Sequence, residues 1–379
     1  MWSVVSRSTS KVVILGCGGF IGSHLLERLL TDGSGVFVEG VDRTPVKIAR
    51  LIDHPLFRFH NIDLRDIDEV RRIIAGSDTV ISLAALCNPY LYTTAPIEVI
   101  ESNFVDMYPV VQACSDLGKR LVHFSTSEVY GRTINGWIDG GESGPALRDI
   151  TFSEEATPLC LGPVGNQRWC YAAAKQLLER TIFAYGFERG LDFTIVRPFN
   201  FIGQRMDYIP GIDGEGVPRV FACFMDALLH GKPLRLVDGG LNRRCFTSID
   251  DAVDAIMLIL ENPDASRRRI FNIGNPENET TIASLAERMI DLYRTLRPGA
   301  AKFGFTVETV PARLFYGEGY EDSDRRVPDI TAITRQLGWR PRVSLDDALR
   351  LSMEGFIKDY CDADVEAAVS GIDSERRSC

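Results

Sequence analysis

The chain has 379 residues, of which 45% are hydrophobic and 25% charged, and its 42 Lys and Arg against 52 Asp and Glu give a formal net charge of −10. This composition excludes fibrous and disordered classes, and because single cores rarely grow beyond roughly 250–300 residues, it favours a globular protein with two lobes. The acidic balance argues against general binding to nucleic acid or to a membrane surface, since those partners require a positive footprint. Phosphate-bearing small ligands need only a few local cations and stay possible.

The nine cysteines form no CxxC pair and no cluster with histidine, so neither a zinc site nor a disulfide framework is predicted. The N-terminal segment Met1–Ser10 is polar. The apolar run that follows, Val12–Leu15, is far too short for a signal peptide or for a membrane span of about 20 residues. We therefore expect a cytoplasmic protein with no bound metal and no membrane partner.

Short apolar runs alternate with longer amphipathic stretches in the first half of the chain. Runs of strand length that are apolar on both faces, as is typical of buried parallel strands, are Val12–Leu15, Val36–Val41, Thr79–Leu83, Leu121–Phe124 and Phe193–Val196. The intervening apolar residues recur at helical spacing, which places one helix face on a sheet. The alternation predicts an α/β fold with a doubly wound parallel sheet of Rossmann type.

After Pro198 the pattern changes, and Gly203–Pro218 is expected to be a long loop. The elements expected beyond it are a helix at Phe221–Leu229, a strand at Leu234–Val237, a helix at Asp250–Leu260, a strand at Ile270–Ile273 and a helix at Ile282–Leu296. We predict a cofactor-binding lobe over residues 11–200, to which 247–262 return, a smaller substrate lobe from 201–246 and 263–357, and a C-terminal tail from 358–379.

A glycine-rich turn follows the first predicted strand. Gly16, Gly19 and Gly22 stand at GxxGxxG spacing, Phe20 and Ile21 belong to the same cofactor loop, and a helix is expected to follow. Such glycines let the backbone turn tightly and approach a pyrophosphate at a helix N-terminus, whose unpaired N–H groups favour negative charge. The alternative is a glycine-rich strand–helix turn that holds no ligand.

Acidic residues follow the second and third predicted strands. Asp42 can accept both ribose hydroxyls of an adenosine and would repel a 2′-phosphate, which favours NAD over NADP, although Arg43 weakens that preference. Asp63 and Leu64 are expected to flank the adenine, unless they form an ordinary polar turn.

Tyr171 and Lys175 are four residues apart in a stretch of good helix formers, so the ammonium can lie near the phenol on one helix face. A phenol with a reference pKa of about 10 is a poor base at neutral pH, and a neighbouring cation together with a positively charged nicotinamide favours its phenolate. The pair indicates a catalytic base and its activator.

A second catalytic candidate follows the predicted strand Leu121–Phe124, at the carboxyl edge where ligands bind in doubly wound sheets. Thr126 and Ser127 could orient a substrate alcohol toward Tyr171. A plain alcohol dehydrogenase needs no carboxylate here, whereas a proton-shuttling step after oxidation does, so Glu128 is either such a group or a solvated turn carboxylate.

Taken together, these segments resemble the extended short-chain dehydrogenase/reductase family of nucleotide-sugar-modifying enzymes, and within it the UDP-glucuronate decarboxylases of the polymyxin-resistance type and the plant UDP-apiose/UDP-xylose synthases. The likeness spans about residues 11 to 357. Besides the glycine turn, it is carried by the segments 125–131, 168–171, 197–200, 206–214, 216–220, 237–240 and 316–329.

The resemblance implies that Asp42 and Asp63 contact NAD, that Tyr171 and Lys175 are the base and its activator, and that Glu128 and Arg326 are a decarboxylation pair. It further implies sugar-nucleotide contacts for Cys87, Tyr92, Thr126, Ser127, Arg168, Asn200, Arg235, Arg244 and Tyr320. Guanidinium groups are natural clamps for diphosphate and carboxylate. The implied partners are a nucleotide sugar, with a UDP sugar favoured, and a second copy of the chain in a homodimer.

Some positions depart from the family pattern. Cys87 agrees with the apiose synthases, but Ser127 stands where those enzymes have a cysteine, which puts ring contraction in doubt because a thiol is the better nucleophile or acid. Phe201 and Gln204 also differ from the family pattern and are expected beside the sugar pocket.

The expected reaction is oxidation of UDP-glucuronate at C4 followed by decarboxylation to UDP-xylose, UDP-apiose or the 4-keto intermediate. Two alternatives stay open: a dehydratase or epimerase acting on another nucleotide sugar or sugar-bearing nucleoside, and a non-catalytic NAD-binding regulatory protein.

Overall fold

The computed structural model describes residues 10–132, 151–210, 217–299, 304–316 and 321–362. Its centre is a sheet of seven parallel strands in the order β11-β6-β5-β4-β1-β2-β3. The strands are β1 (Lys11–Leu15), β2 (Phe37–Asp42), β3 (Phe57–Asn61), β4 (Thr79–Ser82), β5 (Arg120–Phe124), β6 (Phe193–Pro198) and β11 (Arg269–Ile273). The order reverses between β1 and β4, which opens a ligand crevice at their carboxyl ends. The predicted doubly wound α/β fold is confirmed.

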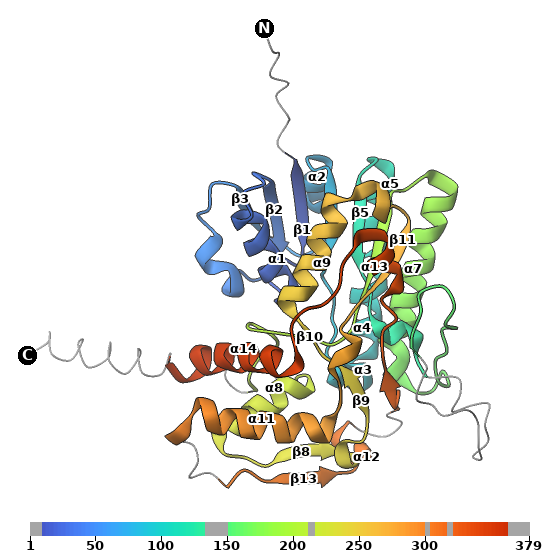
Figure 1. The fold of residues 1–379 in the computed structure, drawn as a ribbon. Coiled ribbons are helices and arrows are strands. Elements are labelled where there is room, and N and C mark those ends of the chain that lie inside the picture. The colour runs from blue at the N-terminus through green and yellow to red at the C-terminus, as the bar shows by residue number, and fades with distance from the viewer. Residues whose placement is uncertain (1–9, 133–150, 211–216, 300–303, 317–320, 363–379) are drawn as a thin grey trace, which may run out of the picture.

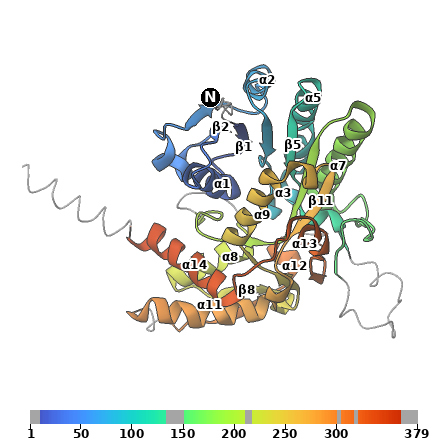
Figure 2. The same ribbon diagram turned by 45° about the horizontal axis from the view of Figure 1, so that its top comes forward.

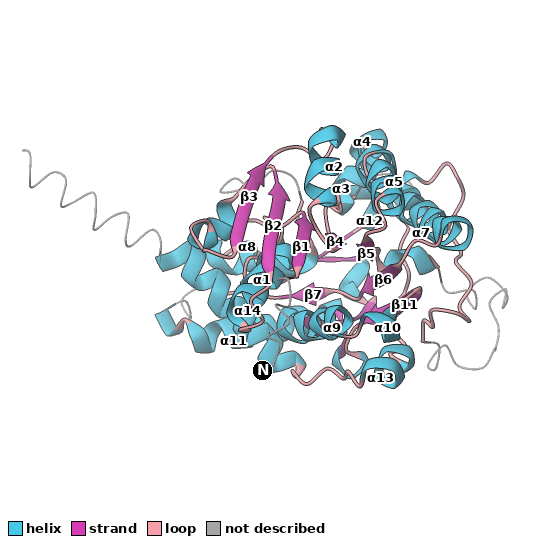
Figure 3. Cartoon of the chain, turned by 90° about the horizontal axis from the view of Figure 1, so that it is seen from above, coloured by secondary structure: helices cyan, strands magenta, loops and turns pink. Residues whose placement is uncertain are grey.

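Helices cover both faces of this sheet (Figures 2 and 3). One face carries α1 (Phe20–Thr31), α9 (Ile249–Glu261), α10 (Pro263–Ser266) and α13 (Thr331–Leu337), and the other carries α2 (Ile67–Ala75), α5 (Tyr108–Asp116) and α7 (Cys170–Arg189). Successive side chains of a strand point to opposite faces, so Val12 and Ile14 of β1 join the core under α1 and α9, while Val13 and Leu15 join the core under α2, α5 and α7. Because both faces are covered, the strands are apolar on both sides.

Shorter elements follow β4 and surround the carboxyl edge. They are α3 (Pro89–Thr94), α4 (Pro96–Ile100), a π-helical turn (Glu101–Val105), and 3-10 turns at Ser127–Tyr130 and Gln167–Trp169. The two-stranded pair of β7 (Phe201–Ile202) and β10 (Thr247–Ser248) leads from this edge toward α9.

A second group of elements lies below the carboxyl ends of the strands in the view of Figure 1. It contains α8 (Val220–His230), β8 (Leu234–Val237), β9 (Arg243–Cys245), β12 (Glu279–Thr281), α11 (Ile282–Leu296), β13 (Val307–Val310), α12 (Ala312–Phe315), β14 (Arg325–Arg326) and α14 (Leu345–Ile357). Within it β12, β9 and β14 form one small sheet, and β13 and β8 form another.

The boundary of the smaller lobe needs a correction. We expected residues 263–357 in the substrate lobe, but β11 is the edge strand of the large sheet, where it pairs with β6. Helix α13 packs near this strand as well (Figure 1). Phe271 and Ile273 of β11 are fully buried, and only the large sheet offers them that cover. The return of the chain to the first lobe therefore extends beyond 247–262.

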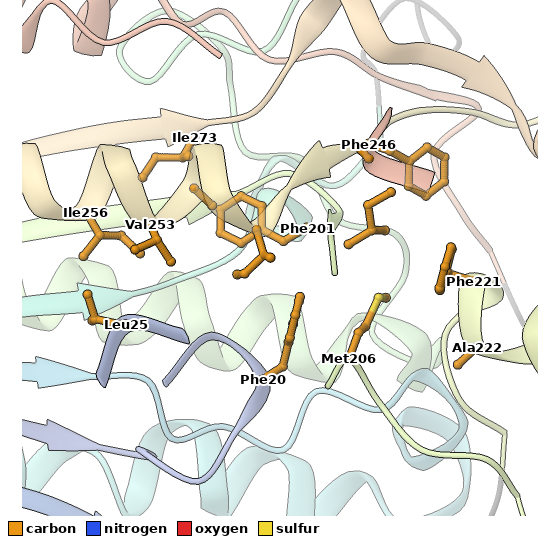
Figure 4. Packing of buried hydrophobic residues seen from close by; sticks show 14 of the residues in the cluster. Phe20, Leu25, Phe201, Met206, Phe221, Ala222, Phe246, Val253, Ile256 and Ile273 are labelled. Atoms are coloured by element: carbon orange, nitrogen blue, oxygen red, sulfur yellow. The ribbon is translucent and has the colours of Figure 1, made fainter. Parts of the chain in front are cut away.

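The two lobes share one hydrophobic core. Figure 4 shows Phe20 and Leu25 of α1 in the same packed cluster as Met206 and as Phe221 of α8. Such a continuous core fixes the second lobe against the cofactor turn, so the crevice between them has a defined shape.

Candidate active site

The glycine turn joins β1 to α1, and its backbone is packed too closely for side chains. Gly16 has φ +91°, a left-handed value, and its N–H donates to the Val41 carbonyl at 2.8 Å. A Cβ on Gly22 would lie 2.2 Å from the Gly16 carbonyl oxygen. Gly18, which the spacing argument did not single out, is equally constrained, because a Cβ there would lie 2.2 Å from the Thr44 carbonyl oxygen. The cradle suits a group that approaches the backbone closely, such as a pyrophosphate.

Asp42 lies against this turn at the end of β2. Its carboxylate accepts the Gly18 N–H at 2.9 Å and the Thr44 N–H at 3.1 Å. After β3, Asp63 accepts two hydrogen bonds from Arg65, at 2.9 and 2.7 Å, which hold the pKa of Asp63 down at about 2. Leu64 packs at the edge of the core under α2. These positions surround the carboxyl end of β2, as the sequence predicted.

Tyr171 and Lys175 lie on the first turns of α7, and both are almost fully buried. The Lys175 ammonium donates to the Phe124 carbonyl oxygen at the end of β5, 3.0 Å away. Burial lowers the pKa of Lys175 to about 8. The ammonium is therefore fixed beneath the carboxyl edge of the sheet.

The pKa of Tyr171 departs from the sequence argument. We expected a neighbouring cation to favour the phenolate, but burial, helped by Cys87 and Glu128, raises the pKa of Tyr171 well above its ordinary value of 10. A hydrogen bond with Thr126 works in the opposite direction. In this environment the desolvation of the phenolate outweighs the favourable contacts.

Thr126, Ser127 and Glu128 occupy the turn that follows β5. The Thr126 hydroxyl caps the 3-10 turn by accepting the Glu128 N–H at 3.1 Å, which aims the Glu128 side chain away from the sheet edge. Ser127 is buried. The alternative of a solvated Glu128 is wrong, because its carboxylate lies in a buried ionic cluster.

That cluster contains three arginines and two carboxylates. Arg168 contacts Glu128 at 2.6 Å and Asp322 at 3.5 Å, while Arg326 contacts Asp322 at 2.6 Å and Glu128 at 3.6 Å. Arg244 contacts Asp322 at 2.6 Å. Burial raises the pKa of Glu128, but the charges of Arg168 and Arg326 outweigh it and hold that pKa below its ordinary value. Among the described residues, the three arginines of the cluster carry one more formal charge than its two carboxylates.

Asp322 is the site residue that sequence reasoning missed. It contacts each of the three arginines, and their charges hold its pKa far below its ordinary value despite burial. The sequence carries a weak signal for this residue, because Asp322 stands four residues before Arg326 in a segment dense in charge of both signs. Nothing in that density distinguishes a buried carboxylate from a solvated one.

The ionic cluster adjoins the Tyr171 phenol through Tyr92. The Tyr92 and Tyr171 rings stack with centroids 5.1 Å apart, and the Arg168 guanidinium lies 5.3 Å from the Tyr92 ring centroid. Cys87 is exposed at the start of the segment leading into α3, and its charge interaction with Tyr171 places it on the same side. The predicted base, hydroxyls and arginines are thus gathered at one edge.

The remaining predicted sugar-nucleotide contacts do not all lie at this edge. Asn200 has φ +40° and donates to the Cys245 carbonyl at 3.1 Å, between the two lobes. Arg235 is 62% exposed and pairs with Glu308 at 2.7 Å on the outer sheet of β8 and β13, so the structure does not bring it into the ionic cluster. Tyr320 lies outside the described residues.

Phe201 and Gln204 do not mark the sugar pocket as expected. Phe201 is buried in the core beside Ile273 and Phe20 (Figure 4). The Gln204 side chain packs against Gly355 of α14, where a Cβ would lie 2.2 Å from Gln204 Cγ. Their differences from the family pattern are therefore changes in packing.

A hollow of about 340 Å³ lies between α1, α9 and α14. Gln204 lines it, whereas the predicted catalytic, cofactor and sugar-nucleotide residues do not. Across the described ranges, no group of three or more His, Cys, Asp and Glu side chains could hold a metal ion. Within the same part of the chain, no helix is long and apolar enough to cross a membrane.

Similarity to known proteins agrees with this geometry. The chain is 46% identical over 363 residues to the UDP-D-apiose/UDP-D-xylose synthase of Oryza sativa subsp. japonica, covering 93% of this chain and 90% of that protein. It is equally identical to UDP-D-apiose/UDP-D-xylose synthase 1 of Arabidopsis thaliana, covering 93% and 92%. The crystal structure of the PbgP3 protein from Burkholderia pseudomallei superimposes with a TM-score of 0.80 at 34% identity, covering 94% of this chain and 98% of that one. The model of the NAD dependent epimerase/dehydratase family matches residues 12–274, and the chain belongs to that family.

Proposed function

We propose that the chain oxidises UDP-glucuronate at C4 with bound NAD and decarboxylates the resulting 4-keto sugar to a UDP-pentose. The observation that carries the proposal is the buried ionic cluster of Glu128, Arg168 and Arg326 beside the stacked Tyr92 and Tyr171. A carboxylate-bearing substrate needs a positive, desolvated site next to the base, and this cluster supplies one. The names of the relatives, UDP-D-apiose/UDP-D-xylose synthase, support the same substrate.

The residues of the glycine turn fit NAD. Gly16, Gly18 and Gly22 form a cradle that side chains would fill, and α1 begins at once behind it. Asp42 at the end of β2 is placed to accept the adenosine ribose hydroxyls, with Asp63 and Leu64 beside the adenine. Bound there, NAD supplies the acceptor for the C4 hydride and returns the hydride after the carbon chemistry.

Tyr171 would remove the proton of the sugar 4-hydroxyl as a phenolate, the form that the positive charge of bound NAD would favour against burial, and Thr126 orients that hydroxyl. The raised pKa of Tyr171 makes the phenol a proton donor at neutral pH once the proton has been taken, so the same group returns it later. Lys175 holds a positive charge beneath the phenol through its bond to the Phe124 carbonyl.

A ketone at C4 makes the C5 carboxylate a β-keto acid. The C5–C6 bond then breaks, carbon dioxide leaves, and its electron pair stays on the sugar as an enolate, which the hydroxyls of Thr126 and Tyr171 stabilise. Arg326 has a buried Nε without a hydrogen-bond partner among the described residues, and it holds the departing carboxylate. Glu128 manages the proton that C5 receives.

The product depends on what precedes the return of hydride to C4. Direct return of hydride to C4 gives UDP-xylose. Cleavage of the C2–C3 bond, formation of a C2–C4 bond and transfer of the hydride to the resulting C3 aldehyde give UDP-apiose, and early release gives the 4-keto sugar. Ser127, a hydroxyl where the apiose synthases carry a thiol, favours UDP-xylose among these products.

Replacement of Arg326 tests the proposal against the dehydratase and epimerase alternative. Arg326→Ala should abolish carbon dioxide release while sparing C4 oxidation, since Arg326 holds the carboxylate whereas Tyr171 and Lys175 are held on α7. Arg288→Ala, which removes an exposed pair with Asp346, is the matched control and should change neither step. Unaltered decarboxylation by Arg326→Ala would contradict the assignment.

We also propose a homodimer in the cytoplasm. Apolar side chains are exposed on neighbouring helices, with Ile97 on α4 72% exposed and Leu177 on α7 49% exposed. Apolar surface of this kind is typically covered by a partner, and a second copy suits helices that pack side by side. Light scattering should give twice the chain mass, and Leu177→Glu should shift it toward the monomer.

The proposed location in the cytoplasm rests on the cysteines. The free thiols, including the exposed Cys87, favour a reducing compartment.

A further inference from the structure

Glu128 and Arg326, the proposed decarboxylation pair, are not joined by a hydrogen bond. Glu128 Oε1 and Arg326 Nη1 are 3.6 Å apart, beyond the usual range of an N–H···O hydrogen bond. The two residues come from distant parts of the chain, Glu128 from the turn after β5 and Arg326 from β14. Arg168 holds the Glu128 carboxylate and Asp322 holds the Arg326 guanidinium, and the supports of the two backbone segments set where these side chains start.

The support for Arg326 lies in the next residues of the chain. Val327 follows it directly, and its carbonyl accepts the Phe152 N–H at 2.8 Å, while the Asp329 N–H donates to the Phe152 carbonyl at 2.9 Å. Pro328 between them packs against Gly274, where a Cβ would lie 2.7 Å from Pro328 Cγ. Phe152 thus pairs like a strand with the segment that carries Arg326.

The support for Glu128 reaches the same residue. Tyr130, two positions after Glu128, is fully buried, and its ring stacks on the Phe152 ring with centroids 4.7 Å apart and planes within 1°. The Arg197 guanidinium covers the Tyr130 ring at 4.7 Å. Phe152 therefore contacts both the segment that carries Glu128 and the segment that carries Arg326.

One side chain links all of these groups. Asn272 on β11 accepts the Tyr130 hydroxyl at 2.7 Å, and its amide nitrogen donates to the Phe152 carbonyl at 2.8 Å and to the Asp329 carbonyl at 3.1 Å. Its own N–H, on the open edge of the large sheet, donates to Glu154 at 2.7 Å. The amide therefore uses both its oxygen and its nitrogen to join the Glu128 turn to the Arg326 segment.

We propose that Asn272, acting through Tyr130 and Phe152, is a positioning residue that sets the distance between Glu128 and Arg326. The inference rests on the proposed function, since it assigns those two residues to the decarboxylation step. It separates that step from C4 oxidation, because Tyr171 and Lys175 are anchored elsewhere, on α7 and at the Phe124 carbonyl. Among the described residues, Asn272 makes no hydrogen bond to a residue of the ionic cluster and acts only through its partners.

Two variants test this role. Tyr130→Phe removes only the hydroxyl that Asn272 accepts and keeps the stacked ring. Asn272→Asp keeps the acceptor but loses both donated bonds. The control is Asn278→Asp, the same change at an equally buried asparagine whose amide instead holds Phe246 and Val343.

Single-turnover reactions with UDP-glucuronate should be followed for oxidised sugar and for carbon dioxide. We expect carbon dioxide release to slow by about tenfold to a hundredfold relative to C4 oxidation in both test variants, because displacements near 1 Å have effects of that size. The 4-keto uronate should accumulate in those variants and not in Asn278→Asp.

A merely structural role predicts a different result, in which oxidation and decarboxylation decline together, and that result would overturn the proposal. An equal slowing of carbon dioxide release relative to C4 oxidation in Asn278→Asp would also overturn the proposal. If Asn272→Asp does not fold, Tyr130→Phe decides alone, because it removes a single oxygen. A wild-type chain that releases no carbon dioxide contradicts the proposed function itself, which is seen before any variant is compared.

Discussion

Tyr171 is a buried phenol on the first turn of α7, stacked on the Tyr92 ring. Replacement by Phe removes the hydroxyl and keeps the ring that stacks on Tyr92. We expect Tyr171→Phe to lower the rate of C4 oxidation by about a hundredfold to ten-thousandfold, the usual range for a lost acid–base group, with little change in thermal stability. The appearance of NADH on addition of UDP-glucuronate measures the rate. An unchanged rate would favour a non-catalytic NAD-binding protein.

Asp322 contacts three arginines of the ionic cluster, although the sequence did not single it out as a site residue. Asp322→Asn keeps the shape and removes the negative charge that contacts each of the three arginines. Breaking a buried ion pair by removing one partner typically costs about 3–5 kcal/mol. We expect a loss of that order in the free energy of unfolding, measured in urea.

The matched control is Asp346→Asn on α14, where the carboxylate is 73% exposed and pairs with Arg288. An exposed pair contributes little to stability, so this variant should unfold like the wild type. Equal stability of the two variants would mean that the Asp322 contacts do not hold the cluster together.

At the scale of elements, the glycine turn between β1 and α1 is the part whose backbone is tightest. Gly18→Ala would place a Cβ 2.2 Å from the Thr44 carbonyl oxygen and displace the loop that Asp42 holds. We expect the purified variant to retain less NAD than the wild type, as measured by chromatography of the denatured protein. Gly165→Ala, where a Cβ meets no atom within 4 Å, is the control and should retain NAD fully.

The segment of Phe152, which pairs with Pro328 just after β14, is sensitive to pH through Glu154. Burial raises its pKa from 4.5 to about 7. The folded state then binds more protons than the unfolded state between about pH 4.5 and pH 7, so the contribution of Glu154 to stability is present below this window and is lost as the pH rises through it.

Glu154→Gln removes this titration and keeps an oxygen that accepts the Asn272 N–H. Its stability relative to the wild type should increase across the same window, by roughly 3 kcal/mol, and level off above it. Urea unfolding at several pH values measures the difference. A difference that is constant with pH would show that Glu154 titrates normally.

The elements that could be predicted from sequence are those whose side-chain pattern carries the signal. The runs at β1, β2, β4, β5 and β6 are apolar on both faces, and their bounds fall within a residue or two of the prediction. The short strands β9 and β14 could not be found this way, because Arg243–Cys245 and Arg325–Arg326 pair across a long stretch of chain and have no apolar alternation. The lobe assignment of β11 failed for the same reason, since strand pairing is not encoded locally.

At the scale of the whole molecule, a chain of net charge −10 is proposed to bind two anionic ligands. Arg168, Arg244 and Arg326 gather into a buried cluster, which places positive charge locally against the overall field. Arg235 was expected with them and instead pairs with Glu308 on the outer surface. The local excess is small because two carboxylates are buried with the arginines.

The sequence identified most of the candidate site and left out how it is supported. Residue type and spacing were enough for Tyr171, Lys175 and the glycines, because their chemistry requires a helix face and a tight turn. Asp322 and Asn272 were not found, since a single Asp or Asn acquires a role only through partners brought by folding.

The central claim is tested most directly by mass spectrometry of the products formed from UDP-glucuronate by the wild-type chain with its bound NAD, without oxygen and without added reductant. The account predicts carbon dioxide together with a UDP-pentose, because the hydride removed at C4 is returned within the same site. An intact UDP-glucuronate signal and no carbon dioxide, from protein shown to carry NAD, would contradict it.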